Sequence, residues 1–321
     1  MTEKWVSLGI VKSLQYLTKS VKLPMTSENP TPSEPIWFTI VRLLRWHKPA
    51  GRLILMIPAL WAIFLAAKGT PPLPLVGVVI LGAIVTSGGG CVVNDLWDRD
   101  IDPKVSRTST RPLASRALSV RVGIAIALLS LVCAAILALY LNRLSFLLCV
   151  AAVPVIICYP LAKRIFPVPQ LVLSIAWGFA VLISWSAVTG KLEPATWLLW
   201  GATVLWTMGF DTVYAMSDME DDRKIGVNSS ALFFGKYGAD AVGLFFAGTA
   251  GLLAYLSIFV SLGSIFWFAW SLAVGGWVWH YLQLKQVSRK KSIYGKIFGQ
   301  NVILGFILLL GMILGSVLPL S

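Results

Sequence analysis

Negative charge is scarce in this chain. Only 14 of its 321 residues are Asp or Glu, and charged residues of both signs make up 13% of the sequence. A soluble domain of this length needs many more charges to cover its surface. The scarcity therefore excludes an ordinary soluble globular protein.

Cysteine is scarce as well. The chain has four cysteines, they lie in apolar stretches, and no two of them have the C-x-x-C spacing (Cys91, Cys133, Cys149 and Cys158). This pattern argues against a disulfide framework and against a cysteine metal cluster. We interpret them as core thiols.

Apolar residues are abundant in place of charged ones. Hydrophobic residues make up 57% of the chain, and the mean hydropathy is +0.79. Segments of roughly twenty apolar residues, enough to cross a bilayer as a helix, occur near 50–67, 73–93, 120–141, 144–162, 169–190, 195–216, 239–262, 264–284 and 297–320. The sequence thus predicts an all-α polytopic membrane helical bundle, with about nine transmembrane helices around a central cavity.

Basic residues give a net charge of +13, which raises the question of a nucleic-acid partner. With the N-terminus in the cytoplasm, however, 24 of the 27 Lys and Arg fall in cytoplasmic segments, leaving Lys68, Arg143 and Lys191 outside. This is the positive-inside distribution of a membrane protein. It predicts a lipid bilayer as the partner, no nucleic acid and no obligatory protein partner, with both acidic segments described below facing the cytoplasm.

The first 35 residues differ from the rest because they are polar and contain Pro and Ser. They lack the apolar core of a signal peptide and the arginines of a mitochondrial presequence. We expect a surface helix from Trp5 to Val21 and a flexible linker. The domain prediction is an N-terminal extension over 1–35 and a transmembrane domain over 36–321.

The few acidic residues are concentrated in two places, each at the end of a long apolar segment. Four lie in NDLWDRDID (Asp95, Asp98, Asp100, Asp102) and five in DTVYAMSDMEDD (Asp211, Asp218, Glu220, Asp221, Asp222). Carboxylates beside hydrocarbon are costly and usually functional. Spacings of three and four residues place Asp95, Asp98 and Asp102 on one helix face, and the second segment repeats the rule.

Repeated aspartates suit Mg²⁺, which takes one or two protein carboxylates and completes its shell with water and phosphate oxygens. Two facing clusters therefore predict Mg²⁺ holding a diphosphate. Nearby cations could bind the phosphate oxygens, namely Arg107, Arg111, Lys163, Arg164, Arg223 and Lys224. The alternatives are ordinary solvated loop charges and the ion path of an ion-coupled transporter.

These two segments, with YPLAKR at 159–164, closely resemble the intramembrane aromatic prenyltransferases of the UbiA superfamily. The resemblance covers the chain from about Leu44 onward. It implies a helical bundle of eight or nine spans, in which metal-bound isoprenyl diphosphate ionises and the allylic cation attacks an aromatic ring. RWHKPAGRLILMIPALWA, at 45–62, is most similar to 4-hydroxybenzoate polyprenyltransferases of ubiquinone- or plastoquinone-type quinone synthesis. We expect a bacterial plasma (inner) membrane, with a thylakoid or an organelle envelope as the alternatives.

The resemblance also implies residue roles. The implied metal ligands are Asp95, Asp98, Asp102, Asp218 and Asp222, and the implied catalytic residues are Asp95, Asp98, Asp218, Asp222 and Lys163. Substrate-binding roles fall to Asn94, Arg107, Arg111, Tyr159, Lys163, Arg164, Asp211, Tyr214 and Lys224. The acceptor's carboxylate needs a cation, for which Arg45, Lys48 and Arg52 are the candidates. Asp100 and Glu220 are not required by the family pattern. Other acceptors of the same chemistry stay open: homogentisate, dihydroxynaphthoate, a chlorophyllide or haem.

Overall fold

The computed structural model describes residues 34–286 and 291–318, and the chain separates into two units, residues 1–38 and 39–321. The expected surface helix from Trp5 to Val21 and most of its linker lie outside the described residues. Helix α2 (Ile36–Leu43) begins in the first unit, and all later helices belong to the second unit.

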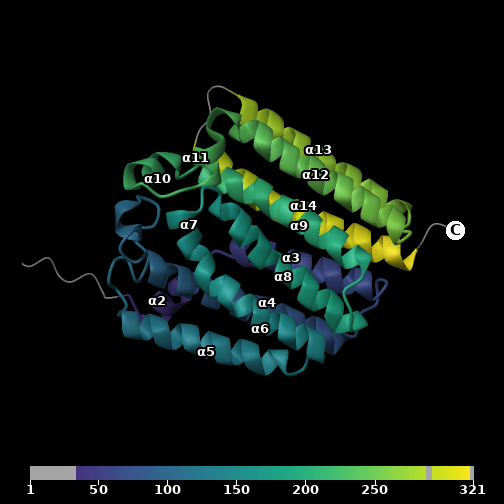
Figure 1. The fold of residues 1–321 in the computed structure, drawn as a ribbon, viewed down its shortest axis with the longest axis horizontal. Helices are drawn as coiled ribbons and strands as arrows, with labels where there is room; N and C mark the ends of the chain where they lie inside the picture. Colours follow the sequence, from purple (N-terminus) through teal and green to yellow (C-terminus); the bar gives the residue numbers. More distant parts are fainter. Residues whose placement is uncertain (1–33, 287–290, 319–321) are drawn as a thin grey trace, which may run out of the picture. The chain divides into compact units, whose positions relative to one another are not determined.

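Helices make up nearly all regular structure in the described part of the chain (Figure 1). The long ones are α3 (Ala50–Ala66), α4 (Leu73–Asp98), α5 (Val120–Ala138), α6 (Arg143–Cys158), α8 (Pro169–Thr189), α9 (Pro194–Ala215), α12 (Gly238–Phe259), α13 (Ser264–Lys285) and α14 (Ser292–Val317). Short elements lie between them: η1 (Asp102–Lys104), η2 (Tyr159–Leu161), α7 (Ala162–Ile165), α10 (Met219–Ile225), α11 (Ser230–Phe234) and η3 (Gly235–Tyr237). The all-α prediction is confirmed.

Six segments of the described chain are long and apolar enough to cross a membrane. They include α4, α5, α6, α8, α12 and α14, whereas α3 is a shorter apolar helix of 17 residues. Helices α9 and α13 are long enough, but their tryptophans and polar residues reduce their hydropathy. The protein is an integral membrane protein, and the expected count of about nine spans is not confirmed.

Consecutive long helices pack side by side, and the last helix, α14, returns to pack against the first, α3. Helix α3 also packs against α4 and α8, so it lies inside the bundle. The Trp61 ring on α3 lies 4.9 Å from that of Trp206 on α9, and the Trp61 indole donates to the carbonyl of Gly305 on α14 at 2.9 Å. A Cβ at Gly305 would lie 2.9 Å from Ile57 and 3.0 Å from Trp206, so a larger residue there would force its neighbours to shift.

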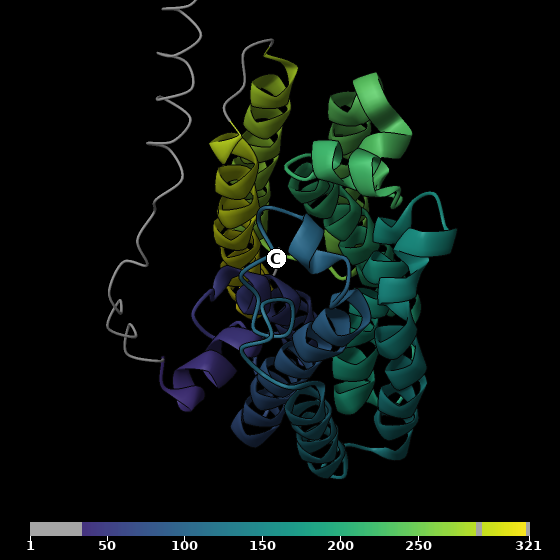
Figure 2. The ribbon, with the colours of Figure 1, turned by 90° about the vertical axis from the view of Figure 1, so that its left-hand side faces the viewer.

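The connections that carry the two acidic segments lie at one end of the bundle, with α7, α10 and α11 (Figure 2). A small apolar cluster fixes the connection after α4 beside that helix. It contains Leu43, Val92, Leu113 and Leu118, all buried. Burial of these side chains holds residues 39–44 and the 99–119 connection against α4, and so positions the polar side chains described next.

Candidate active site

The first acidic segment ends α4 and continues into η1. Asp95 and Asp98 occupy the last turn of α4 and Asp102 opens η1, and all three are buried. The expected continuous helical row is therefore wrong beyond Asp98, because the helix stops there and a tight turn returns Asp102 to the same side. Burial raises the pKa of Asp102, and the nearby charge of Arg111 opposes that shift.

Each buried carboxylate of this segment has a basic partner. Asp95 Oδ1 accepts from Arg45 at 2.6 Å and from Arg111 at 3.1 Å. The same Arg111 nitrogen donates to Asp102 Oδ2 at 2.8 Å, and Lys163 on α7 pairs with Asp98. Buried charges require such partners, so three of the predicted substrate-binding cations, Arg45, Arg111 and Lys163, lie where the sequence placed the metal ligands.

The second acidic segment is divided between two helices. Asp211 and Tyr214 lie in the last turns of α9, Asp218 immediately precedes α10, and Asp222 lies within α10. The expected single helical row is therefore wrong here as well, because the chain turns between Ala215 and Asp218. Burial raises the pKa of Asp222 to about 6, and a hydrogen bond from Ser229 opposes the shift.

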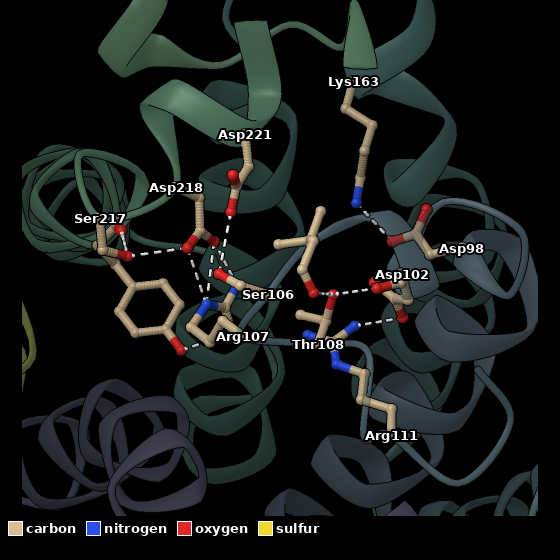
Figure 3. Close-up of polar contacts among 12 residues, drawn as sticks. Asp98, Asp102, Ser106, Arg107, Thr108, Arg111, Lys163, Ser217, Asp218 and Asp221 are labelled. Carbon is tan, nitrogen blue, oxygen red and sulfur yellow. Dashed lines mark hydrogen bonds and ion pairs between the residues drawn. The ribbon is translucent and has the colours of Figure 1, made fainter. Parts of the chain in front are cut away.

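One stretch of the loop between α4 and α5 contacts both acidic segments (Figure 3). Ser106 donates to Asp221 at 3.2 Å, and Arg107 Nε donates to both oxygens of Asp218 at 2.9 and 3.0 Å. Four residues after Arg107, Arg111 binds Asp95 and Asp102 of the first segment. The two segments are therefore joined by one loop at one end of the bundle.

Lys163 provides a second link between the segments. Its ammonium pairs with Asp98, and its carbonyl accepts from the backbone N–H of Asn228, just after α10, at 2.8 Å. Its charge also acts on Asp211 and Asp222. The two sets of carboxylates therefore face a common basic centre.

A group of cations lies beside these carboxylates. Burial and the neighbouring charges of Arg107, Arg45 and Arg111 lower the pKa of Lys48. Lys48 makes no ion pair with any described residue, whereas the three arginines are each bound to a carboxylate. Of the three candidates for an acceptor carboxylate, Arg45 is bound to Asp95, whereas Lys48 and Arg52 make no ion pair with any described residue. Lys48 is the one that lies near Arg107 and Arg111.

The remaining predicted residues lie at different distances from this centre. Tyr159 and Arg45 interact electrostatically, and Asn94 is half-buried on α4. Arg164 lies elsewhere: its guanidinium donates to the carbonyl of Trp97 at 2.6 Å and caps the end of α4. Lys224 is exposed on α10, and its side chain has no hydrogen bond or ion pair within 34–286 and 291–318. The structure does not bring Arg164 and Lys224 to the carboxylates.

Several contributors had no clear signal in the sequence. Ser106 is one, because nothing in its neighbourhood indicates a partner 115 residues away. Phe298 on α14 is another: its ring lies 5.1 Å from that of Tyr214.

Arg45 adopts a left-handed backbone conformation, with φ of 55°, at the position after α2 where glycine is usual. Such strain is retained where a side chain is needed.

Within the described residues no three His, Cys, Asp or Glu side chains converge closely enough to hold a metal ion alone. The donor set still fits Mg²⁺, which needs few protein carboxylates when phosphate and water complete its shell. Asp98 Oδ1 is buried and has no hydrogen-bond partner among these residues. An unpaired buried carboxylate oxygen is costly, and a cation at this position would satisfy it.

Comparison with known proteins bears on what this geometry does. A sequence model of the UbiA prenyltransferase family matches residues 55–314, which is well over half of the chain. The chain belongs to the UbiA prenyltransferase family. The UbiA resemblance stated from the two acidic segments is thereby confirmed.

Among curated UbiA proteins, a 4-hydroxybenzoate solanesyltransferase of a Synechocystis species is 68% identical over 291 residues, covering 91% of this chain and 99% of that relative. Among solved structures, the apo form of a UbiA homolog from Aeropyrum pernix has a TM-score of 0.72 at 25% identity, covering 81% of this chain and 96% of the other. A UbiA homolog from Archaeoglobus fulgidus, bound to GPP and Mg²⁺, has a TM-score of 0.65 at 20% identity, covering 84% and 99%. The fold is thus that of the UbiA family.

Proposed function

We propose that this protein transfers a polyprenyl group from its diphosphate to the ring of 4-hydroxybenzoate, in a Mg²⁺-dependent step of quinone synthesis. The observation that carries the proposal is the loop whose Arg107 and Arg111 bind carboxylates of both acidic segments. The 68% identity to a 4-hydroxybenzoate solanesyltransferase supports the acceptor and a long prenyl donor. The Archaeoglobus homolog's bound GPP and Mg²⁺ support the metal and the diphosphate.

Asp98, Asp102, Asp218 and Asp222, together with Asp95, are the residues that would hold the metal. Bound Mg²⁺ supplies positive charge that neutralises a diphosphate leaving group. Arg107, Arg111 and Lys163 already lie among these carboxylates, so they are within reach of the same phosphate oxygens. Arginine is suited to this because its guanidinium binds two phosphate oxygens at once.

The reaction breaks the allylic C–O bond, and the electron pair leaves with the diphosphate. Negative charge grows on the phosphate oxygens as the bond breaks, so fixed cations stabilise the transition state more than the intact substrate. The allylic carbon then bonds to the ring carbon ortho to the phenol oxygen, and a base takes the proton from that carbon. Lys48, whose charge is uncommitted, binds the carboxylate of the acceptor.

The site must also keep water away from the allylic cation. Phe210, Trp177, Tyr214 and Phe298 form a connected set of rings on the bundle side of Asp218, with neighbouring ring centres 5.1 to 5.6 Å apart. We propose that the prenyl chain leaves the diphosphate site along these rings into a central cavity of the bundle. We also propose that the bundle has about nine spans in a bacterial plasma membrane and that this end of it faces the cytoplasm. The positive-inside distribution supports the orientation.

The test is an assay of membranes containing the protein with Mg²⁺, a labelled polyprenyl diphosphate and a panel of acceptors, with and without a chelator. We expect prenylated 4-hydroxybenzoate, lost on chelation. Asp95→Ala and Asp218→Ala should abolish product while the protein stays folded and inserted. If homogentisate, dihydroxynaphthoate, a chlorophyllide or haem is prenylated instead, that compound is the acceptor and 4-hydroxybenzoate is not. No product with any acceptor, or full activity in both variants, would contradict the proposal.

A further inference from the structure

Arg107 is held more firmly than its position suggests. It lies in the loop between α4 and α5, and 36% of its side chain is exposed. An arginine in such a loop ordinarily samples many rotamers. Here Nε donates to both oxygens of Asp218, Nη2 pairs with the same carboxylate, and Nη1 donates to the Tyr214 hydroxyl at 3.0 Å. These bonds fix the plane of the guanidinium.

Tyr214 makes two different contacts with Arg107. Besides accepting the hydrogen bond, it places its ring face beneath the guanidinium, with Arg107 Cζ 4.9 Å from the ring centre. A cation over an aromatic face within about 6 Å is stabilised electrostatically. The hydrogen bond to the hydroxyl therefore orients the guanidinium, and the ring face fixes its distance from α9.

The Tyr214 ring is itself held from the far end of the chain. Phe298 on α14 lies 5.1 Å from Tyr214 and 5.6 Å from Phe210, the latter at an interplanar angle of 86°. Phe210 is fully buried in the bundle, whereas Tyr214 and Phe298 are half-buried beside the polar cluster. Phe298 thus joins the rigid core to the ring under Arg107.

We propose that Tyr214 and Phe298, called here the aromatic bracket, are positioning residues that fix the Arg107 guanidinium for the leaving diphosphate. They act through Arg107 and need not touch the reacting atoms. This inference rests on the proposed function, because it assigns the bracket to the diphosphate half of that site. It differs from an aromatic wall of an acceptor pocket, since it predicts an effect on the donor and not on the acceptor.

The experiment is a double-mutant cycle in the full-length protein in lipid nanodiscs. Phe298→Leu is made in the native chain and in Arg107→Gln, and binding of inorganic pyrophosphate with Mg²⁺ is measured alongside the KM for the polyprenyl diphosphate. Since an aromatic pair contributes roughly two- to tenfold to an equilibrium, we expect Phe298→Leu to weaken pyrophosphate binding by that factor in the native chain. In Arg107→Gln it should change binding by less than about 1.5-fold. Phe306→Leu, about two turns along the same helix, is the matched control.

Further variants separate positioning from folding. Phe298→Tyr keeps the ring and should restore binding, and Tyr214→Phe should lose only the part due to the hydroxyl. The KM for 4-hydroxybenzoate should not change in any of them. Equal losses in both Arg107 backgrounds, no loss in the native chain, an equal loss in Phe306→Leu, or a failure of Phe298→Tyr to restore binding would each overturn the bracket. A native protein that binds pyrophosphate but prenylates no acceptor would overturn the proposed function and leave the cycle readable from binding alone. A native protein that binds no pyrophosphate would overturn the bracket itself.

Discussion

Replacing Arg111 with methionine perturbs the most heavily shared ion pair of the site. One Arg111 nitrogen lies 3.1 Å from Asp95 Oδ1 and 2.8 Å from Asp102 Oδ2. The two carboxylates are only 2% and 6% exposed, and the arginine is 16% exposed. Methionine fills similar space without charge, so the substitution removes the cation and little of the packing.

The expected cost follows from what each carboxylate retains. Asp95 keeps Arg45 at 2.6 Å, whereas Asp102 loses its ion-pair partner. Breaking a buried ion pair usually costs about 3–5 kcal/mol, and the solvent that reaches this arginine lowers that figure. We therefore expect Arg111→Met to lower the free energy of unfolding by about 2 kcal/mol at pH 7.5.

The assay is reversible denaturant unfolding in mixed micelles, with Asp102→Asn as the second arm. Asparagine has the shape of aspartate without its charge, so Arg111→Met with Asp102→Asn should recover at least about half of the loss. Burial already raises the pKa of Asp102 against the opposing effect of Arg111. Removing Arg111 raises this pKa further, and a carboxyl with a raised folded-state pKa destabilises as pH rises toward that value. The loss should thus be smaller at pH 5 than at pH 7.5. A loss under about 0.5 kcal/mol, or none recovered by Asp102→Asn, would refute the reasoning.

Two other predictions test the metal site and the packing. Because burial raises the pKa of Asp222 to about 6, protons compete with Mg²⁺ there, so Mg²⁺ affinity should fall roughly tenfold from pH 7 to pH 5. The decrease should be smaller in Asp222→Asn, in which protons still compete at Asp102, whose pKa is also raised. Calorimetric titration measures the Mg²⁺ affinity, and an equal decrease in the variant would contradict the prediction. In α14, a Cβ at Gly311 would lie 2.4 Å from Ala269, whereas one at Gly299 meets nothing within 4 Å. Gly311→Ala should therefore cost about 1–3 kcal/mol of unfolding free energy, and Gly299→Ala should be neutral or stabilising; equal effects in unfolding assays would show that helix separation does not depend on glycine here.

The apolar segments of the sequence predicted where the long helices lie, but not where each one ends. The segments expected at 73–93 and 169–190 are α4 and α8, but α4 continues to Asp98. The last turn of α4 contains polar residues, so the apolar segment in the sequence ends before the helix does. Hydropathy likewise finds helices α9 and α13 as long helices without deciding whether they span a membrane.

Spacing predicted that Asp95, Asp98 and Asp102 share one helix face, but the helix stops between the last two. Which basic residue pairs with which carboxylate could not be predicted from spacing in the sequence. Arg107 reaches Asp218, 111 residues later, and Arg164 caps α4 away from the carboxylates. Such contacts depend on how helices distant in sequence pack, which local periodicity does not contain.

The central claim is that both acidic segments hold one magnesium-bound diphosphate. A structure of the full-length protein with Mn²⁺ and a polyprenyl thiolodiphosphate, using anomalous scattering to locate the metal, tests it most directly. We predict metal and phosphate between Asp98 and Asp218, with Arg107, Arg111 and Lys163 on the phosphate oxygens. Metal and diphosphate bound anywhere else on the protein, or contacting only one of the two segments, would contradict the claim.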